Sequence, residues 1–310
     1  MPWLKKGLIY SARGEFGFNH SHCHKPTPLI LDDQTVRVYF GVRDQKIVTR
    51  TTFVDLDIND LSTVKYVHNQ PVLDVGKLGT FDDSGANVSS LVRHNDEIYM
   101  YYIGWNPGTT VPTRNAIGLA VSRDNGLTFE RLFDGPVLDR NKFDPYYIGA
   151  VDVKKYGDLW QCWYTCGTEW KIINGKPEIW YHVKYATSEN GIDWERENIS
   201  CIPPINEFEA TARPSVIKEG QLYKMWYSRR SLINFRSDRK NSYRAGYAES
   251  TDGITWIRKD DRVGIDVSDE GWDSEAIGYP YVIRIKDKLI MFYNGNGFGK
   301  TGFGYAEYVE

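Results

Sequence analysis

The segment Ser250-Thr-Asp-Gly-Ile-Thr-Trp256 has two close copies earlier in the chain, Ser122-Arg-Asp-Asn-Gly-Leu-Thr-Phe129 and Ser188-Glu-Asn-Gly-Ile-Asp-Trp194. Each copy contains Asn-Gly or Asp-Gly, which favour a tight hairpin because glycine accepts the positive φ that such turns need. A β-strand pattern precedes each copy, and its final aromatic residue is expected to begin another strand. The repeated element is therefore predicted to be a β-hairpin.

Two kinds of strand recur around these turns, always in the same order, which is the signature of a repeat architecture. The first kind is rich in aromatic residues and is followed along the chain by the second. The first kind spans residues 36–41, 98–104, 160–165, 223–228 and 290–295. The second kind spans residues 47–50, 118–122, 184–188, 246–250 and 304–308. Five units are thus predicted.

Four strands per unit, a period of about sixty residues and no amphipathic helix are typical of propeller blades. The chain is therefore predicted to be all-β, with residues 1–310 forming a single five-bladed β-propeller domain. The fifth unit has only three strands, while residues 4–10 form an unpaired strand at the other end of the chain. We expect this N-terminal strand to join the last blade and close the ring, which removes exposed sheet edges.

The composition is that of an ordinary water-soluble protein, with 25% charged residues and a net charge of −3. No strong positive field points to a nucleic acid partner. The N-terminus lacks the apolar run of a signal peptide or membrane span, so no membrane association and a cytoplasmic location are expected. Cys162 and Cys166 are predicted to be buried strand residues, and no cofactor is expected. The 14% aromatic content suits strand packing and also stacking on sugar rings.

The chemistry of a propeller is expected where the innermost strands of all blades begin, around a shared central funnel. Those segments are residues 18–26, 81–87, 143–149, 208–214 and 272–280, and each opens with an aromatic residue followed by an acid or asparagine. The recurrent Asp82, Asp144 and Asp273 are expected to be hydrogen-bonding residues of the scaffold. Residues that break the repeat are the better functional candidates, because buried charge is costly without a purpose.

Glycoside hydrolysis needs a carboxylic acid and a carboxylate on either side of the scissile bond. Asp83 and Glu275 are predicted as this pair, with Glu209 as a third acid. Arg213, Arg229 and the histidines could hold an anionic group of the substrate. The residues predicted to bind substrate are His22, His24, Asp152, Arg213, Trp105, Arg229 and Tyr279.

Three histidines alternate along the first of these segments, at positions 20, 22 and 24. If the segment is extended, all three side chains point the same way. Aligned imidazoles could contact a phosphate or carboxylate, or donate hydrogen bonds to sugar hydroxyls. A metal site formed by His20, His22 and His24 is the less favoured alternative, since Asp83 or Glu275 would have to complete its ligand shell.

The hairpin turns and the Tyr-Tyr or Trp-Tyr strands, spread over the whole chain, resemble the five-bladed propeller superfamily of glycosidases. This superfamily includes invertases, levansucrases, arabinanases, xylosidases and mannoside phosphorylases. The sequence motifs are most similar to those of short glycosidase-like proteins of bacterial surface-polysaccharide gene clusters. The resemblance implies carbohydrate chemistry by an aspartate of the first blade, a second aspartate and a later glutamate. This chain instead carries His-Ser-His-Cys-His-Lys in blade one, and its nearest match to the Arg-Asp-Pro motif is Phe143-Asp144-Pro145.

Three functions follow as hypotheses. The first is a glycoside hydrolase-like enzyme that acts on a charged or modified bacterial sugar with Asp83, Glu209 and Glu275. The second is a phosphate-dependent glycoside phosphorylase, in which the arginines hold phosphate. The third is a noncatalytic glycan-binding propeller. In each case the expected partner is a carbohydrate or a nucleotide- or phospho-sugar.

Overall fold

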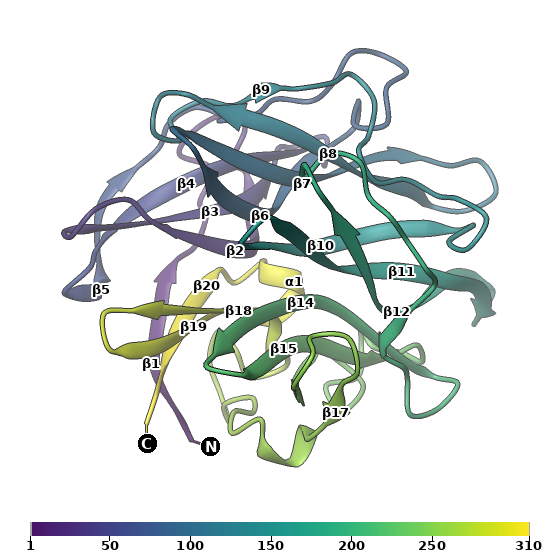
Figure 1. The fold of residues 1–310 in the computed structure, drawn as a ribbon. Helices are drawn as coiled ribbons and strands as arrows, with labels where there is room; N and C mark the ends of the chain where they lie inside the picture. The colour runs from purple at the N-terminus through teal and green to yellow at the C-terminus, as the bar shows by residue number, and fades with distance from the viewer. Residues whose placement is uncertain (1, 310) are drawn as a thin grey trace.

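A computed structural model describes residues 2–309 and has five four-stranded antiparallel sheets arranged around a central axis (Figure 1). The predicted all-β, five-bladed propeller is therefore confirmed. Blade one contains β2 (Ser21–Ile30), β3 (Thr35–Arg43), β4 (Thr49–Asp57) and β5 (Asp60–Val67). Blade two contains β6 (Ala86–His94), β7 (Glu97–Pro107), β8 (Thr113–Ser122) and β9 (Glu130–Arg131).

Blades three and four repeat this order from the inner to the outer strand. Blade three contains β10 (Tyr147–Tyr156), β11 (Leu159–Ile173), β12 (Lys176–Ser188) and β13 (Ser200–Ile202). Blade four contains β14 (Glu209–Glu219), β15 (Leu222–Ser231), β16 (Arg244–Ser250) and β17 (Ile257–Arg258). The helical segments are the 3-10 turn η1 (Asp260–Arg262) and the short α1 (Asn296–Gly299). Among residues 2–309 no helix has the length and apolar character needed to cross a bilayer.

Blade five takes its outer strand from the other end of the chain, as predicted. It contains β18 (Gly278–Ile285), β19 (Lys288–Asn294) and β20 (Phe303–Tyr308), and β1 (Trp3–Tyr10) pairs antiparallel with β20. The two ends of the chain lie side by side in Figure 1, and the Val309 amide donates to the Pro2 carbonyl at 3.1 Å. This pairing closes the ring and covers the edge of β20.

Most observed strands extend beyond the predicted ranges, and two begin two or more residues after the predicted start. Residues 47–50 were expected to be a strand, but β4 begins only at Thr49, because the Asp44 carboxylate accepts from the amides of Lys46 and Val48 and holds a turn. In blade three the outer strand was expected to begin at Trp194, but β13 begins six residues later. Arg196, between the two, turns inward to an ion pair with the buried Asp144.

The recurrent aspartates are part of the blade scaffold, as predicted. In blades two, three and five a buried tyrosine twenty residues further along donates its hydroxyl to the aspartate, and a cation neutralises the charge. The tyrosine pairs are Tyr102 with Asp82 at 3.0 Å, Tyr164 with Asp144 at 2.9 Å and Tyr293 with Asp273 at 3.0 Å. The cations are Arg131, Lys184 and Lys5, respectively. Hydrogen bonds of this kind satisfy buried charges that would otherwise be costly.

Candidate functional site

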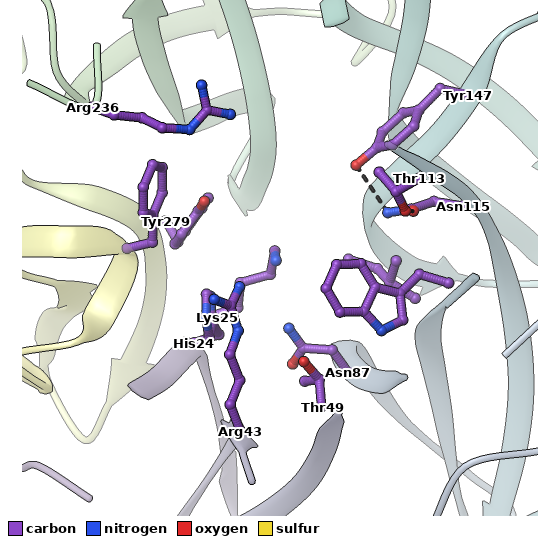
Figure 2. A pocket seen from close by; sticks show the side chains of 13 residues that line it. His24, Lys25, Arg43, Thr49, Asn87, Thr113, Asn115, Tyr147, Arg236 and Tyr279 are labelled. Atoms are coloured by element: carbon purple, nitrogen blue, oxygen red, sulfur yellow. Dashed lines mark hydrogen bonds between the residues drawn. The ribbon is translucent and has the colours of Figure 1, made fainter. Parts of the chain in front are cut away.

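A cavity of about 310 Å³ lies where the inner strands begin, on the propeller axis (Figure 2). Its walls come from all five blades, since the loop that follows β15 of blade four contributes Arg236. The lining includes three cationic side chains, and no aspartate or glutamate of the described chain is part of it. The lining residues are His24, Lys25, Arg43, Thr49, Asn87, Ile103, Trp105, Thr113, Asn115, Tyr147, Arg236, Tyr279 and Phe298.

A backbone irregularity in the inner strands directs side chains toward the axis. Every pairing of an inner strand with its neighbour contains a register shift. In three blades the shift coincides with a residue that precedes proline and has a left-handed backbone, namely Lys25 (φ 53°), Arg213 (φ 54°) and Tyr279 (φ 54°). Such a conformation costs roughly 1–3 kcal/mol for a residue with a side chain and is found mostly at functional sites.

Lys25 extends its amine into the middle of the cavity (Figure 2). Its Nζ lies 4.8 Å from the ring centroid of Tyr279, and within residues 2–309 it makes no ion pair or hydrogen bond. Its backbone amide donates to the Asn294 Oδ1 at 2.7 Å, which fixes the strained backbone. Burial, followed by repulsion from Arg213 and Arg43, lowers the pKa of Lys25 to about 7.

Arg43 and Arg236 add two further positive charges to the walls (Figure 2). Arg43 stands at the end of β3 beside Lys25, and burial lowers the pKa of its guanidinium. Arg236 has an exposed side chain and an ion pair with Glu178 outside the cavity. Arg43 is therefore the cation with the greater capacity to bind an anion.

Four buried polar atoms around the cavity have no hydrogen-bond partner within residues 2–309. They are His24 Nε2, Arg43 Nε, Asn87 Oδ1 and Arg213 Nε. His24 is 5% exposed and Asn87 is 8% exposed. A buried polar atom that no ligand or other group hydrogen-bonds costs about 1–3 kcal/mol. Such groups gathered at one cavity make it the candidate binding site for a polar molecule.

The opposite wall carries an ordered chain of hydrogen bonds. The Thr113 hydroxyl donates to the Asn115 Oδ1 at 2.8 Å, and the Asn115 amide donates to the Tyr147 hydroxyl oxygen at 2.9 Å (Figure 2). Since the Tyr147 oxygen is the acceptor, its own proton remains free to be donated. Burial raises the pKa of Tyr147, so the phenol is protonated at neutral pH.

Trp105, one of the residues predicted to bind substrate, lies in the wall of the cavity. Its indole Nε1 donates to the Ser84 carbonyl at 2.6 Å, which fixes the ring in the wall. The ring lies directly against Gly85, where a Cβ would stand 1.6 Å from the indole nitrogen. A side chain at position 85 would therefore displace the tryptophan.

Below the main cavity a smaller space of about 70 Å³ shares Lys25, Tyr147 and Tyr279 with it and ends on Arg213. Arg213 is fully buried and donates to the Ser89 carbonyl and to the Thr27 hydroxyl. Burial lowers its pKa to about 10. Arg213 thus adds a buried positive charge to the smaller space that Lys25 also lines.

Of the residues predicted to bind substrate, His24, Trp105 and Tyr279 line the main cavity and Arg213 lines its lower part. His22 lies behind His24, with the two rings stacked at a centroid distance of 4.9 Å. The expected extended alternation of the three histidines is wrong, because β2 contains two register shifts and His20 is exposed before the strand begins. No group of three or more potential metal ligands exists among the described residues.

Asp152 and Arg229 lie away from the cavity. Asp152 is fully buried, pairs with Lys154 at 3.0 Å and accepts from the Val216 amide at 2.6 Å, so it links the inner strands of blades three and four. Arg229 lines a separate groove at the rim of blade four, together with Glu209.

The three predicted acids are not brought together. Asp83 belongs to the turn before β6, where its carboxylate accepts from the Gly79 amide and the Ser84 hydroxyl. Glu209 is buried in an ion pair with Arg258. Glu275 is exposed beside a small depression of about 40 Å³ that adjoins the cavity through Tyr279.

Sequence reasoning did not select several residues of the site. Lys25, Asn87 and Tyr147 lie within the segments predicted to begin the inner strands, but their residue types do not break the repeat as the acids and histidines do. The pairs Lys25-Pro26 and Tyr279-Pro280 were a usable signal, because proline after an inward residue recurs at the same place in the repeat. Arg43, Asn115 and Arg236 lie outside these segments and left no comparable signal.

Comparison with solved structures places the fold in a known class. The chain has the five-bladed propeller fold found in glycoside hydrolases. One solved glycoside hydrolase matches with a TM-score of 0.74 at 17% identity, covering 98% of this chain and 91% of the other. A putative glycosidase from Bacteroides thetaiotaomicron matches with a TM-score of 0.73 at 18% identity, covering 99% and 96%. A thermostable family-43 glycoside hydrolase matches with a TM-score of 0.66 at 18% identity, covering 94% and 91%.

At the level of sequence the relationship is more specific. The chain is 34% identical over 307 residues to the uncharacterized protein MT1551 of Mycobacterium tuberculosis strain CDC 1551, covering 99% of both chains. The same identity and coverage hold for the uncharacterized protein Rv1502 of strain H37Rv. The chain therefore belongs to the family of these mycobacterial proteins. No family model matches it.

Proposed function

We propose that the central cavity binds a carbohydrate that carries a negatively charged group. The observation that carries this proposal is the charge of the lining, which has Lys25, Arg43 and Arg236 and no carboxylate in the described chain. Arginine is suited to a carboxylate or phosphate because its planar donors match the geometry of the anion. The likeness in fold to solved glycoside hydrolases supports a sugar as the ligand.

The remaining lining suits the neutral part of a sugar. The Asn87 amide, the Asn115 amide and the hydroxyls of Thr49 and Thr113 are donors and acceptors for sugar hydroxyls. Trp105 offers an aromatic face on which the apolar side of a pyranose ring can stack. A cavity of about 310 Å³ accommodates a ligand at the small end of the usual pocket range, which corresponds to one or two sugar units.

This proposal differs from hydrolysis by paired carboxylates. Asp83, Glu209 and Glu275 lie outside the cavity lining, so none of them is assigned a role in ligand contact. Hydrolysis through these acids remains a testable alternative. If it operates, Glu275→Gln abolishes release of reducing sugar from a bound oligosaccharide.

The test is calorimetric titration of the protein with three matched sets of sugars, namely neutral oligosaccharides, the corresponding uronic acids and the corresponding sugar phosphates. We expect the charged sugars to bind at least tenfold more tightly than the neutral ones, with an affinity that falls as salt is raised. Arg43→Met is expected to remove this preference, whereas Arg229→Met is expected to retain it. Equal affinity for neutral and charged sugars would overturn the proposal.

A further inference from the structure

We infer that the cavity is built for β-elimination of a uronide, with Lys25 as the base and Tyr147 as the acid. The inference rests on the proposed function and makes it more specific, because it names the charged group as the carboxylate of a uronic acid. It also replaces hydrolysis with a reaction that needs no carboxylate pair.

The chemistry fits the residues present. A base takes the proton from C5 of the uronide, the bond from C4 to the glycosidic oxygen breaks, and a double bond forms between C4 and C5. The acid gives its proton to the departing oxygen, so the base gains one proton, the acid loses one, and exchange with water restores both. No water is added to the products and no oxidant or other co-reactant is required. The C5 proton becomes removable when cations hold the adjacent carboxylate and stabilise the charge that develops on it.

Lys25 has the position that a base requires. Its amine projects into the cavity, and in the described chain no acid holds it in an ion pair (Figure 2). The groups around it are Arg43 from β3, Arg213 from β14, Tyr279 from β18 and His24 from its own strand. None of these is a carboxylate, and the two arginines favour the neutral amine. The lowered pKa of Lys25, about 7, agrees with this role.

Arg43 is placed to hold the carboxylate. It approaches the same part of the cavity as Lys25, and its Nε is a buried donor without a partner in the described chain (Figure 2). His24 Nε2, also buried and unpartnered, can add a hydrogen bond when it carries the proton. A carboxylate bound here would bring C5 of the uronide, the carbon next to the carboxylate, close to the Lys25 amine.

Tyr147 is placed to act as the acid. It faces Lys25 from the other side of the cavity, and Asn115 donates to its oxygen (Figure 2). Because the oxygen accepts this hydrogen bond, the phenolic proton is available to a ligand, and the same bond stabilises the phenolate that forms when the proton leaves. Lys25 and Tyr147 therefore lie on either side of a ligand, as removal of a proton and protonation of a leaving group require.

The experiment uses the full-length protein with purified oligogalacturonate, oligoglucuronate and oligomannuronate. Turnover is followed by the near-ultraviolet absorbance of the new double bond conjugated to the carboxylate and by mass spectrometry. We expect at least one uronide to yield an unsaturated product whose mass, added to that of its partner fragment, equals the mass of the substrate. Lys25→Met and Tyr147→Phe are expected to lower kcat at least 100-fold and to leave calorimetric binding within about tenfold. The matched surface changes Lys218→Met and Tyr66→Phe are expected to have no effect.

A chemical rescue distinguishes catalysis by Lys25 from a structural role. Treatment of Lys25→Cys with 2-bromoethylamine restores an amine on a side chain as long as lysine, in which sulfur replaces the γ-methylene. Turnover is expected to return. The native cysteines Cys23, Cys162, Cys166 and Cys201 are all buried, which favours selective reaction at position 25.

The outcomes separate the two proposals. Binding of uronides without any turnover overturns the elimination and leaves the proposed function standing. Products that have gained water show hydrolysis and also overturn the elimination. If none of the charged sugars binds, both the elimination and the proposed function are overturned.

Discussion

Glu209, the first residue of the inner strand β14, and Arg258 of the outer strand β17 form a two-point ion pair, with Arg258 Nη1 at 2.7 Å from Oε2 and Nη2 at 2.9 Å from Oε1. Arg258 also bonds Asp260, whose other oxygen accepts from the Tyr227 hydroxyl at 2.6 Å. Blade four thus keeps the buried tyrosine, acid and cation of the other blades and adds one acid. Asp260 accepts from the tyrosine and so takes the part of the scaffold acid in blade four, and Glu209, which follows Phe208, is the added acid.

We therefore predict that Glu209→Ala lowers the free energy of unfolding by about 3 kcal/mol, because it leaves a partly buried guanidinium with one partner fewer. Urea unfolding followed by tryptophan fluorescence measures this change. Glu207→Ala, which alters an exposed glutamate two residues earlier, is the control and is expected to be neutral. Unchanged stability together with lost ligand binding would show that Glu209 serves the site instead.

The fold could be predicted from the sequence because a repeat states the same information five times. Glycine turns, paired aromatic residues and alternating apolar positions recur in one order, so an ambiguous strand in one blade is identified by its equivalents in the others. Strand ends were less predictable where a single side chain intervened, as Asp44 does before β4. The repeat also identified Asp82, Asp144 and Asp273 as scaffold, but it did not identify Asp260, which bonds the buried tyrosine of blade four from outside the strand-entry segments.

Ring closure gives a second prediction, at Trp3. This side chain is 6% exposed and packs edge-on against Trp226 of blade four at 5.8 Å and against Tyr308 at 5.4 Å. Trp3→Ala is expected to cost about 3–5 kcal/mol, because a large cavity opens between the blades that close the ring. Thermal unfolding measures the effect.

The neighbouring Leu4 provides the matched control for Trp3. It is 52% exposed, so Leu4→Ala is expected to change stability by less than about 0.5 kcal/mol. Equal effects of the two substitutions would mean that β1 contributes through its backbone pairing alone and that the tryptophan contacts between blades matter little.

The site was less predictable than the fold because a funnel is formed by residues that share no local pattern. His24, Trp105 and Tyr279 stood out by residue type, and Lys25 and Tyr147 lay in the right segments. Arg43 and Arg236 reach the cavity from the end of a strand and from a loop, and their placement depends on how neighbouring blades meet. The sequence also did not show whether the acids face the axis. A β-bulge in each inner strand changes the side of the sheet toward which the later residues point.

The stacked histidines predict a sensitivity to acid. Burial is the main reason that the pKa of His22 falls to about 4, from about 6.5 in an unfolded chain. Between these values the unfolded chain binds a proton that the folded protein does not, so stability is lost as pH falls from about 6.5 to about 4. His22→Phe keeps a ring against His24 and is expected to remove up to about 1.4 kcal/mol per pH unit of this slope. Urea unfolding at pH 4.5, 5.5 and 6.5 tests the prediction, with the exposed His20→Phe expected to keep the full slope.

Lys25 predicts a pH dependence at the other end of the range. Its pKa falls to about 7 in the folded protein, mainly by burial, from about 10.4 in an unfolded chain. Between these values the unfolded chain again binds the additional proton, so the contribution of Lys25 to stability rises with pH from about 7 to about 10. Below pH 7 the full cost of burying the ammonium is present. Lys25→Met is therefore expected to be more stable than the unaltered protein at pH 6, and the difference is expected to shrink by up to about 1.4 kcal/mol per pH unit above pH 7.

Urea unfolding of both proteins between pH 6 and pH 9.5 measures this difference. Lys218→Met, at an exposed lysine near the end of β14, is the matched control and is expected to show no pH-dependent difference. A cavity that keeps an unpaired lysine at the expense of stability is expected where the amine acts on a ligand, because selection for stability alone would replace it. If Lys25→Met is less stable than the unaltered protein at every pH, the lysine supports the fold. Its left-handed backbone and its position between Arg43 and Arg213 would then need a structural explanation in place of a functional one.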